Sequence, residues 1–431
     1  MIRLFAAIAF VLGAMPALAA VEVQEVTSEK GITAWLVEEH SIPFTALEIR
    51  FRGGTSLDRE GKRGETNLMM GLIEEGAGDL DARGFAEARD DLAASYEFDA
   101  YLDSVTISAR FLTENRDAAV DLLRSALIDT RFDQDAVDRV RGQVLSIIAS
   151  DATDPRSIAS NTFYNMAYGD HPYGSDQNGT PESLATLTRD DMFAARDRAM
   201  ALDRLYVAAV GDITPDELAV LLDRLLGDLP ATGGDMPSVA VPQVDGQVHV
   251  VPYETPQSVV FFGHRGIDRN SPDFVAAYVA NEILGGTRES RLMDEVREKR
   301  GLTYGIGAYL ASSDFGQNIL GQFSTGNATA GEAVTVVKDV WANLVEEGIT
   351  AEELDAAKTY LTGAYALRFD GNGPIANILV GMQMTGLPRD YIVERNDLVN
   401  AVTLDEINRV VREIYRPEDL TFVVVGQPEG L

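Results

Sequence analysis

The sequence predicts an α+β protein made of two tandem homologous domains, each with an antiparallel-rich sheet and helices packed on one face. Three observations support this prediction. Runs rich in β-branched and aromatic residues are mixed with long helical stretches that follow one another, instead of alternating strictly with strands. A stretch rich in glycine and proline, residues 227–246, interrupts the chain near its middle. Residues of the first half also recur in the second half at a nearly constant offset.

Two groups of residues repeat. The segment 205–211 is echoed 215 residues later by 420–426, and both segments end in glycine. In each copy a threonine suited to a helix N-cap, Thr188 or Thr403, lies 23 residues before that glycine. The second group has an offset of 208: Tyr96, Ala100, Tyr101 and Leu102 match Tyr304, Ala308, Tyr309 and Leu310. Two copies of one fold explain both echoes.

The elements expected in the first half follow from periodicity and from glycine and proline positions. Residues 153–155 and the loop 170–174 break the pattern. In the second half a helix is expected near 273–284, and Thr350 and Glu353 form a capping box for another. The first-half expectations are strands at 32–37, 45–51, 96–102, 105–111 and 205–210, and helices at 65–75, 82–94, 118–128, 133–149 and 189–198.

Composition excludes several classes of protein. The 431 residues carry 68 acidic and 36 basic side chains, a formal net charge of −32. Such a chain would be repelled by nucleic acid and by anionic membranes, so neither is expected as a partner. The acidic surface is explained by solubility, and recognition of cationic substrates is the alternative. With no cysteine in the sequence, disulfides, thiolate nucleophiles and cysteine metal sites are excluded.

The N-terminus is typical of a secretory signal peptide. Residues 1–20 carry one positive charge at Arg3, an apolar run, and an A-x-A cleavage site ending at Ala19. A membrane anchor is the alternative, but the apolar run is short for a bilayer span. We therefore expect a periplasmic protein with no membrane attachment after cleavage. The expected division of the chain is signal peptide 1–20, N-terminal domain 21–226, linker 227–246 and C-terminal domain 247–431.

The most informative stretch is 285–310. Two glycines precede a charged amphipathic segment, and Gly301 is expected to end that helix before a strand, so that Arg297 and Tyr304 face one cleft. By themselves a solvated arginine and a core tyrosine are the simpler interpretation. The surrounding sequence, SRL…VREKRGLTYG, resembles the C-terminal half of the insulinase/pitrilysin-type zinc peptidases, the inverzincins. That resemblance covers nearly all of the chain after the signal peptide and implies that Arg297 and Tyr304 contact substrate.

The same resemblance locates the positions where zinc would be bound. Peptidases of this family carry H-x-x-E-H on a helix of the first domain, with a glutamate roughly 76 residues further on as the third ligand. The corresponding residues here are Asn67, Met70, Gly71 and Ile147. An amide is a poor zinc ligand, and thioether, glycine and isoleucine cannot replace the glutamate base or the ligands. Glu74 and Glu75 are an alternative metal site, although adjacent acids of this kind are usually solvated.

The resemblance therefore implies a divided enzyme. It looks like the non-zinc subunit of heterodimeric members, similar to the non-catalytic subunit of mitochondrial processing peptidase and its bacterial homologues. We expect no metal or other cofactor in this chain, zinc in a homologous partner that carries H-x-x-E-H, and a peptide substrate. Arg297 and Tyr304 would support substrate and transition state opposite the partner's metal. The alternative is a homodimeric peptide-binding or scaffold protein of the same fold, without hydrolysis.

Overall fold

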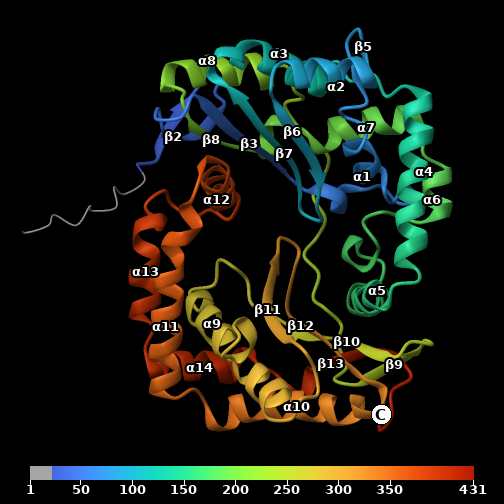
Figure 1. Cartoon of the computed structure of the whole chain (residues 1–431), viewed down its shortest axis with the longest axis vertical. Helices are drawn as coiled ribbons and strands as arrows, with labels where there is room; N and C mark the ends of the chain where they lie inside the picture. Colours follow the sequence, from blue (N-terminus) through green and yellow to red (C-terminus); the bar gives the residue numbers. More distant parts are fainter. Residues whose placement is uncertain (1–21) are drawn as a thin grey trace, which may run out of the picture.

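The computed structural model describes residues 22–431 and has the predicted mixture of antiparallel-rich sheets and helices (Figure 1). The expected signal peptide, residues 1–20, lies outside the described residues. Between residues 22 and 431, no helix is both long enough and apolar enough to cross a bilayer.

The first-half sheet has the strand order β1-β2-β8-β3-β7-β6 within the described chain. Neighbouring strands are antiparallel except β2 and β8, which run parallel. A small hairpin, β4 (Gly76–Ala77) and β5 (Leu80–Asp81), lies apart from this sheet. The sheet strands are β1 (Gln24–Thr27), β2 (Thr33–Glu38), β3 (Phe44–Arg52), β6 (Ser95–Ala100), β7 (Ser104–Leu112) and β8 (Leu205–Gly211).

The second-half sheet repeats this topology. Its order is β11-β12-β10-β13-β9, again antiparallel except for one parallel pair, β13 with β9. The strands align one for one with β6-β7-β3-β8-β2, so the sequence echoes mark equivalent positions in two copies of one sheet. These strands are β9 (Val248–Pro252), β10 (Gln257–Arg265), β11 (Ile306–Ser313), β12 (Gly316–Gly326) and β13 (Thr421–Gly426).

The echoed threonines open equivalent helices. Thr188 caps α7 (Arg189–Ala199) and Thr403 caps α14 (Leu404–Ile414), each through a reciprocal capping box. Both helices lead into the strand that ends at Gly211 or at Gly426. At these two glycines φ is +142° and +154°, and a Cβ on Gly211 would lie 2.2 Å from the carbonyl oxygen of Phe44. The repeated glycine is thus required by close packing of the backbone.

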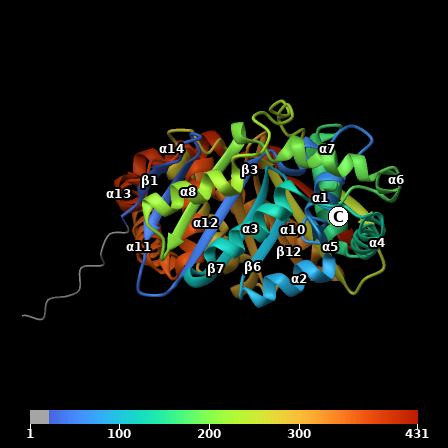
Figure 2. The ribbon, with the colours of Figure 1, turned by 90° about the horizontal axis from the view of Figure 1, so that it is seen from above.

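Each sheet buries one face against helices of its own half, as predicted. Viewed from above, α3 and α8 cross the outside of the first sheet (Figure 2). Below the second sheet, α10 lies along the bottom of Figure 1. The remaining helices of the first half are α1 (Glu65–Met70), α2 (Ala82–Asp91), α3 (Arg116–Ile128), α4 (Gln134–Asp151), α6 (Pro181–Ala185) and α8 (Pro215–Leu226); those of the second half are α9 (Phe274–Asn281), α10 (Ala330–Glu347), α11 (Ala351–Tyr365) and α13 (Tyr391–Ala401).

Two further helices cross between the halves. Helix α5 (Pro155–Tyr168) packs on β10 and β13 of the second sheet, and α12 (Asn372–Met384) packs on β3 and β8 of the first (Figure 1). Their apolar side chains form two buried clusters with those strands. Each sheet therefore has part of its second face covered by a helix from the other half. The domain limits drawn from sequence remain a prediction, and residues 227–247 contain no helix or strand.

Candidate functional site

The segment before β11 ends as the sequence predicts. A π-helical turn, Met293–Glu298, leads to Gly301, where φ is +63°. The Gly301 N–H donates to the carbonyl of Arg297 at 2.8 Å, and the Leu302 N–H donates to that of Val296 at 2.9 Å. These two bonds cap the helix end around a left-handed glycine, so the chain turns sharply toward the strand.

The glycine pair before this segment has a packing role. Residues Glu282–Gly286 continue α9 as a π-helical turn, against which β11 packs. A Cβ on Gly285 would lie only 2.6 Å from the backbone nitrogen of Ala308. Any side chain at Gly285 would push β11 away, so this glycine sets the position of the strand that follows Tyr304.

Tyr304 is held outward in the turn between the helix and β11. The hydroxyl of Thr303 lies 2.8 Å from the carbonyl oxygen of Ser324 and accepts a hydrogen bond from the Gly305 N–H at 3.2 Å. These contacts fix the turn on both sides of Tyr304, whose side chain is 90% exposed. The simpler interpretation of Tyr304 as a core residue is therefore wrong.

Tyr304 lines a cavity of about 540 Å³ on the second-half sheet. The cavity is bounded by the turn 303–305, by β11 and β12, and by the start of β10. Arg156, at the beginning of α5, closes it from the first half of the chain. The polar side chains that line it are Arg156, Gln257, Thr303, Tyr304, Tyr309, Gln322 and Ser324.

This lining suits a neutral, hydrogen-bonding ligand such as a peptide backbone. Gln257 and Gln322 each offer a donor and an acceptor, and Arg156 offers only donors. Burial raises the pKa of Tyr309, which keeps its phenol protonated as a further donor. Among the described residues that line the cavity there is no Asp or Glu.

Arg297 lies on the helical side of the turn and does not line this cavity. Its side chain is partly exposed, and Nε lies 3.5 Å from Oε1 of its neighbour Glu298. A more firmly held arginine nearby is Arg291, whose Nε donates to Glu353 at 2.6 Å. Of the predicted pair, the structure thus assigns Tyr304 to the cavity, and the joint role of Arg297 stays a prediction.

The four positions that correspond to zinc ligands and base carry other side chains with other contacts. Asn67 in α1 donates through Nδ2 to Oδ1 of Asn178 at 2.9 Å, and Met70 is buried in the first-half core. Gly71 ends the helix, and a Cβ there would meet Val140 at 3.2 Å. Ile147 is half exposed on α4. None of these groups fits a zinc ion.

The alternative acidic pair is already engaged by arginines. Glu74 accepts from Nη1 of Arg89 at 2.9 Å, and Glu75 forms a two-bonded ion pair with Arg139. Over residues 22–431, no three histidine, cysteine, aspartate or glutamate side chains are grouped as a metal site would need. Glu74 and Glu75 therefore serve as surface ion-pair partners in this structure.

Sequence reasoning missed the residues that complete the Tyr304 cavity. Arg156 directly follows residues 153–155, which break the sequence pattern, and Gln257 and Gln322 lie on strands without any catalytic motif. One signal was present for Tyr309, because strand alternation places it on the same face as Gly307, two residues earlier. Nothing local in the sequence connects Arg156 with a turn about 150 residues later.

Comparisons with known proteins identify the family and the fold. Residues 186–361 match the family model described as "Peptidase M16 inactive domain". A relative from Helicobacter pylori named "Non-peptidase homolog YmxG" is 28% identical over 391 residues, covering 90% of each chain. "Uncharacterized zinc protease YmxG" of Bacillus subtilis is 23% identical over 414 residues, covering 95% of this chain and 99% of the relative.

Solved structures share the whole fold. The crystal structure of a peptidase M16 inactive domain from Pseudomonas fluorescens superposes with a TM-score of 0.88 at 26% identity, covering 94% of this chain and 98% of that one. The structure of a protease from Helicobacter pylori gives a TM-score of 0.84 at 17% identity, covering 94% and 99%. The similarity thus extends over both halves and both crossing helices.

Proposed function

Because this chain belongs to the peptidase M16 family, the insulinase/pitrilysin type, and to its inactive, non-peptidase homologues, we propose that it is the substrate-binding subunit of a heterodimeric zinc metallopeptidase of the periplasm. In this proposal the chain does not hydrolyse peptides by itself. A homologous partner bearing H-x-x-E-H supplies the metal, and this chain supplies contacts to the peptide. The exported location rests on the signal-like residues 1–20.

One contrast carries the proposal. Tyr304 is almost fully exposed and lines a cavity to which the described residues contribute no acid, whereas the positions for metal ligands and base hold Asn67, Met70, Gly71 and Ile147. A large exposed tyrosine on a turn that is fixed by hydrogen bonds of its two neighbours is typical of a contact residue. This contrast supports a chain that binds peptide and leaves zinc binding to a partner.

The cavity also lies beside a sheet edge. β11 is the last strand of the second-half sheet within the described chain, and at its middle the Ala308 carbonyl already accepts a hydrogen bond from Asn281 at 3.0 Å, so only the ends of this edge are open. An extended peptide can add to such an edge through main-chain hydrogen bonds. In this arrangement the Tyr304 hydroxyl donates to a carbonyl of the substrate peptide. Gln257 and Gln322 form hydrogen bonds with the backbone amides of that peptide. Arg297 approaches from the helical side with its fixed fork of donors.

Co-purification tests the proposal. The chain, tagged and isolated from its native host, should bring with it an exported chain of similar size that contains an intact H-x-x-E-H. The isolated chain should have no peptidase activity, the pair should cleave unfolded peptides, and a chelator should abolish that cleavage. Recovery of the chain without such a partner, together with no peptidase activity, would contradict the heterodimer.

A second candidate is a homodimeric peptide-binding or scaffold protein. It is favoured by the Helicobacter pylori relative, whose name states that it is not a peptidase. This candidate requires no zinc-bearing companion, so the coding sequence next to this one is a simple discriminator. It also predicts that the pure chain forms a stable dimer and binds an extended peptide with full occupancy of the Tyr304 cavity.

A further inference from the structure

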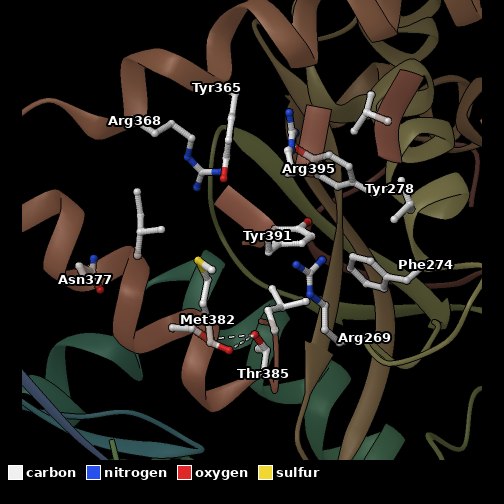
Figure 3. A pocket seen from close by; sticks show the side chains of 15 residues that line it. Arg269, Phe274, Tyr278, Tyr365, Arg368, Asn377, Met382, Thr385, Tyr391 and Arg395 are labelled. Atoms are coloured by element: carbon white, nitrogen blue, oxygen red, sulfur yellow. Dashed lines mark hydrogen bonds between the residues drawn. The ribbon is translucent and has the colours of Figure 1, made fainter. Parts of the chain in front are cut away.

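A second cavity, about 350 Å³ in volume, lies between α9, α12, α13 and the end of α11 (Figure 3). It shares no lining residue with the Tyr304 cavity. Its volume is that of a small-molecule site. The cavity also lies between helices that pack in different cores, since α12 covers the first-half sheet and α9 belongs to the second-half core.

Three arginines from different elements line this cavity. In Figure 3 Arg269 and Arg368 lie on opposite sides of Tyr391, and Arg395 lies beside Tyr278. No Asp or Glu occurs among the described residues that line the cavity. In a chain with 68 acids and 36 bases, three cations without a lining acid form a local reversal of charge.

Arg395 is the fixed member of the group. It is 6% exposed, donates to the carbonyl of Leu361 at 2.7 Å, and lies 3.3 Å from the hydroxyl of Tyr278. Its guanidinium also stacks on the Tyr365 ring, 4.6 Å from the centroid. The acid that faces it from α9's end is Glu282, whose pKa is raised by burial and lowered in part by Arg395. This arginine is therefore held rigidly in place.

Arg269 and Arg368 are held less firmly. Neither lies within ion-pair distance of a carboxylate in residues 22–431, although many other arginines of this chain do. Arg269 is placed by the Phe274 ring, 4.2 Å from its centroid. Each of these two guanidiniums, with aromatic surface beside it, offers a planar fork of donors that can bind a carboxylate.

We propose that this cavity binds a small carboxylate-bearing ligand with an aromatic or apolar body. Arg269 or Arg368 would take the carboxylate, and Met382, Tyr278 and Tyr391 would contact the body. The carboxylate can come from a free organic acid or from the C-terminal residue of a peptide, since both present the same group. This inference does not depend on the proposed peptidase partnership.

The position of the cavity gives the ligand a structural effect. A ligand that touches α12 and α9 together bridges the cover of the first sheet and the core of the second. Binding to the folded chain alone raises the unfolding temperature by mass action.

Calorimetric titration of the full chain tests the proposal with three probes: 3-phenylpropionate, N-acetyl-phenylalanine and N-acetyl-phenylalanine amide. The acids should bind with Kd at or below roughly 1 mM, and the amide should bind at least about tenfold more weakly because it lacks the charge. Binding by phenylpropionate alone identifies a free acid as the source, and tighter binding by N-acetyl-phenylalanine identifies a peptide terminus.

The double variant Arg269→Met/Arg368→Met should lower the affinity for both acids by at least about tenfold. Arg412→Met is the matched control, because Arg412 is exposed on α14, outside the cavity, and carries the same charge. Equal thermal stability of the three proteins without ligand would show that the folds are intact. The proposal is overturned if no acid binds, if acid and amide bind equally, or if Arg412→Met weakens binding as much as the double variant.

Discussion

Phe163 of α5 packs edge to face against Phe261 of β10, with ring centroids 5.3 Å apart. A side chain of the first half thus completes a core on the face of the second-half sheet that is turned away from α10. Helix α12 makes the reciprocal contact, with Ile375 and Leu379 in the cluster that covers the first-half sheet. Neither sheet can be fully covered by its own half, so the two halves should unfold together.

Phe163→Ala is expected to lower the free energy of unfolding by about 3–5 kcal/mol, the usual effect of removing a fully buried phenylalanine. The chain contains two tryptophans, Trp35 in β2 and Trp341 in α10, so each half has its own fluorescence probe. Urea unfolding of Trp35→Phe and Trp341→Phe backgrounds separates the two signals. Phe163→Ala should shift both transitions by the same amount.

Ile147→Ala is the control for this experiment, because Ile147 is half exposed on α4 and belongs to none of the buried clusters. It should leave both transitions within about 0.5 kcal/mol of the starting protein. A Phe163→Ala protein in which only the Trp341 signal moves would mean that the halves unfold independently, contrary to the exchange of helices.

The sequence predicted the features that short segments determine. Gly301 ends its helix, Thr188 and Thr403 cap theirs, and the repeated glycines close equivalent strands. Each of these features depends on hydrogen bonds or dihedral angles within a few residues. The local order of residues therefore predicts them directly.

Helix α5 was missed, and its environment explains why. Asp154 and Pro155 were interpreted as a break, but Asp154 caps the helix by accepting from the Ser157 N–H, and Pro155 occupies the first turn. The helix is rich in Ser and Asn, and its apolar side chains face a sheet of the other half. Amphipathic spacing indicates a buried face but not which sheet covers it. The Arg156 wall of the Tyr304 cavity could not be predicted for the same reason.

Tyr304→Phe in the reconstituted peptidase pair is expected to lower kcat by about 10-fold or more with little change in assembly. The removed hydroxyl lies at an exposed position and supports no core contact. Arg297→Ala should also lower turnover, through loss of its donors to substrate. Steady-state kinetics on an unfolded peptide, with size-exclusion chromatography of the pair, measure both effects.

Tyr360→Phe provides the matched control, since Tyr360 is also exposed but lies on α11 outside the Tyr304 cavity. Its kinetics should equal those of the unmodified pair. Rates that are unchanged in both Tyr304→Phe and Arg297→Ala would remove the proposed role of these residues in substrate binding.

His264 should titrate below the ordinary pKa of histidine, and His40 should titrate above it. Burial lowers the pKa of His264 to about 4, and the Trp341 indole N–H donates to its Nε2 at 3.0 Å. Hydrogen bonds to Asp212 and Glu38 raise the pKa of His40. Proton NMR titration of the chain, with His→Gln variants for assignment, should show His264 neutral throughout pH 5–8 and His40 titrating above pH 6.5.

These shifts have opposite effects on stability. The unfolded chain binds a proton at residue 264 below about pH 6.5 while the folded chain does not, so stability falls as the pH falls from 6.5 toward 4. By pH 5 the loss is about 2 kcal/mol. The contribution of His40 is present below pH 6.5 and is lost as the pH rises through its raised pKa. Urea unfolding of His264→Gln should show a shallower fall between pH 6.5 and 5 than His249→Gln. An identical slope in the two variants would contradict the assignment.

The purified chain should retain less than about 0.1 zinc ion per molecule after dialysis, because amide, thioether, hydrogen and alkyl groups replace the ligands and base. Asn67→His/Gly71→His gives a positive control, since it restores two imidazoles one helical turn apart in α1 and its end. Val140 lies 3.2 Å from the new Cβ at position 71 and must move slightly to admit it. Metal analysis by mass spectrometry should find more zinc in this variant than in the original chain. One tightly held zinc per original chain would mean that it binds metal through other side chains and would remove the basis for a partner that supplies it.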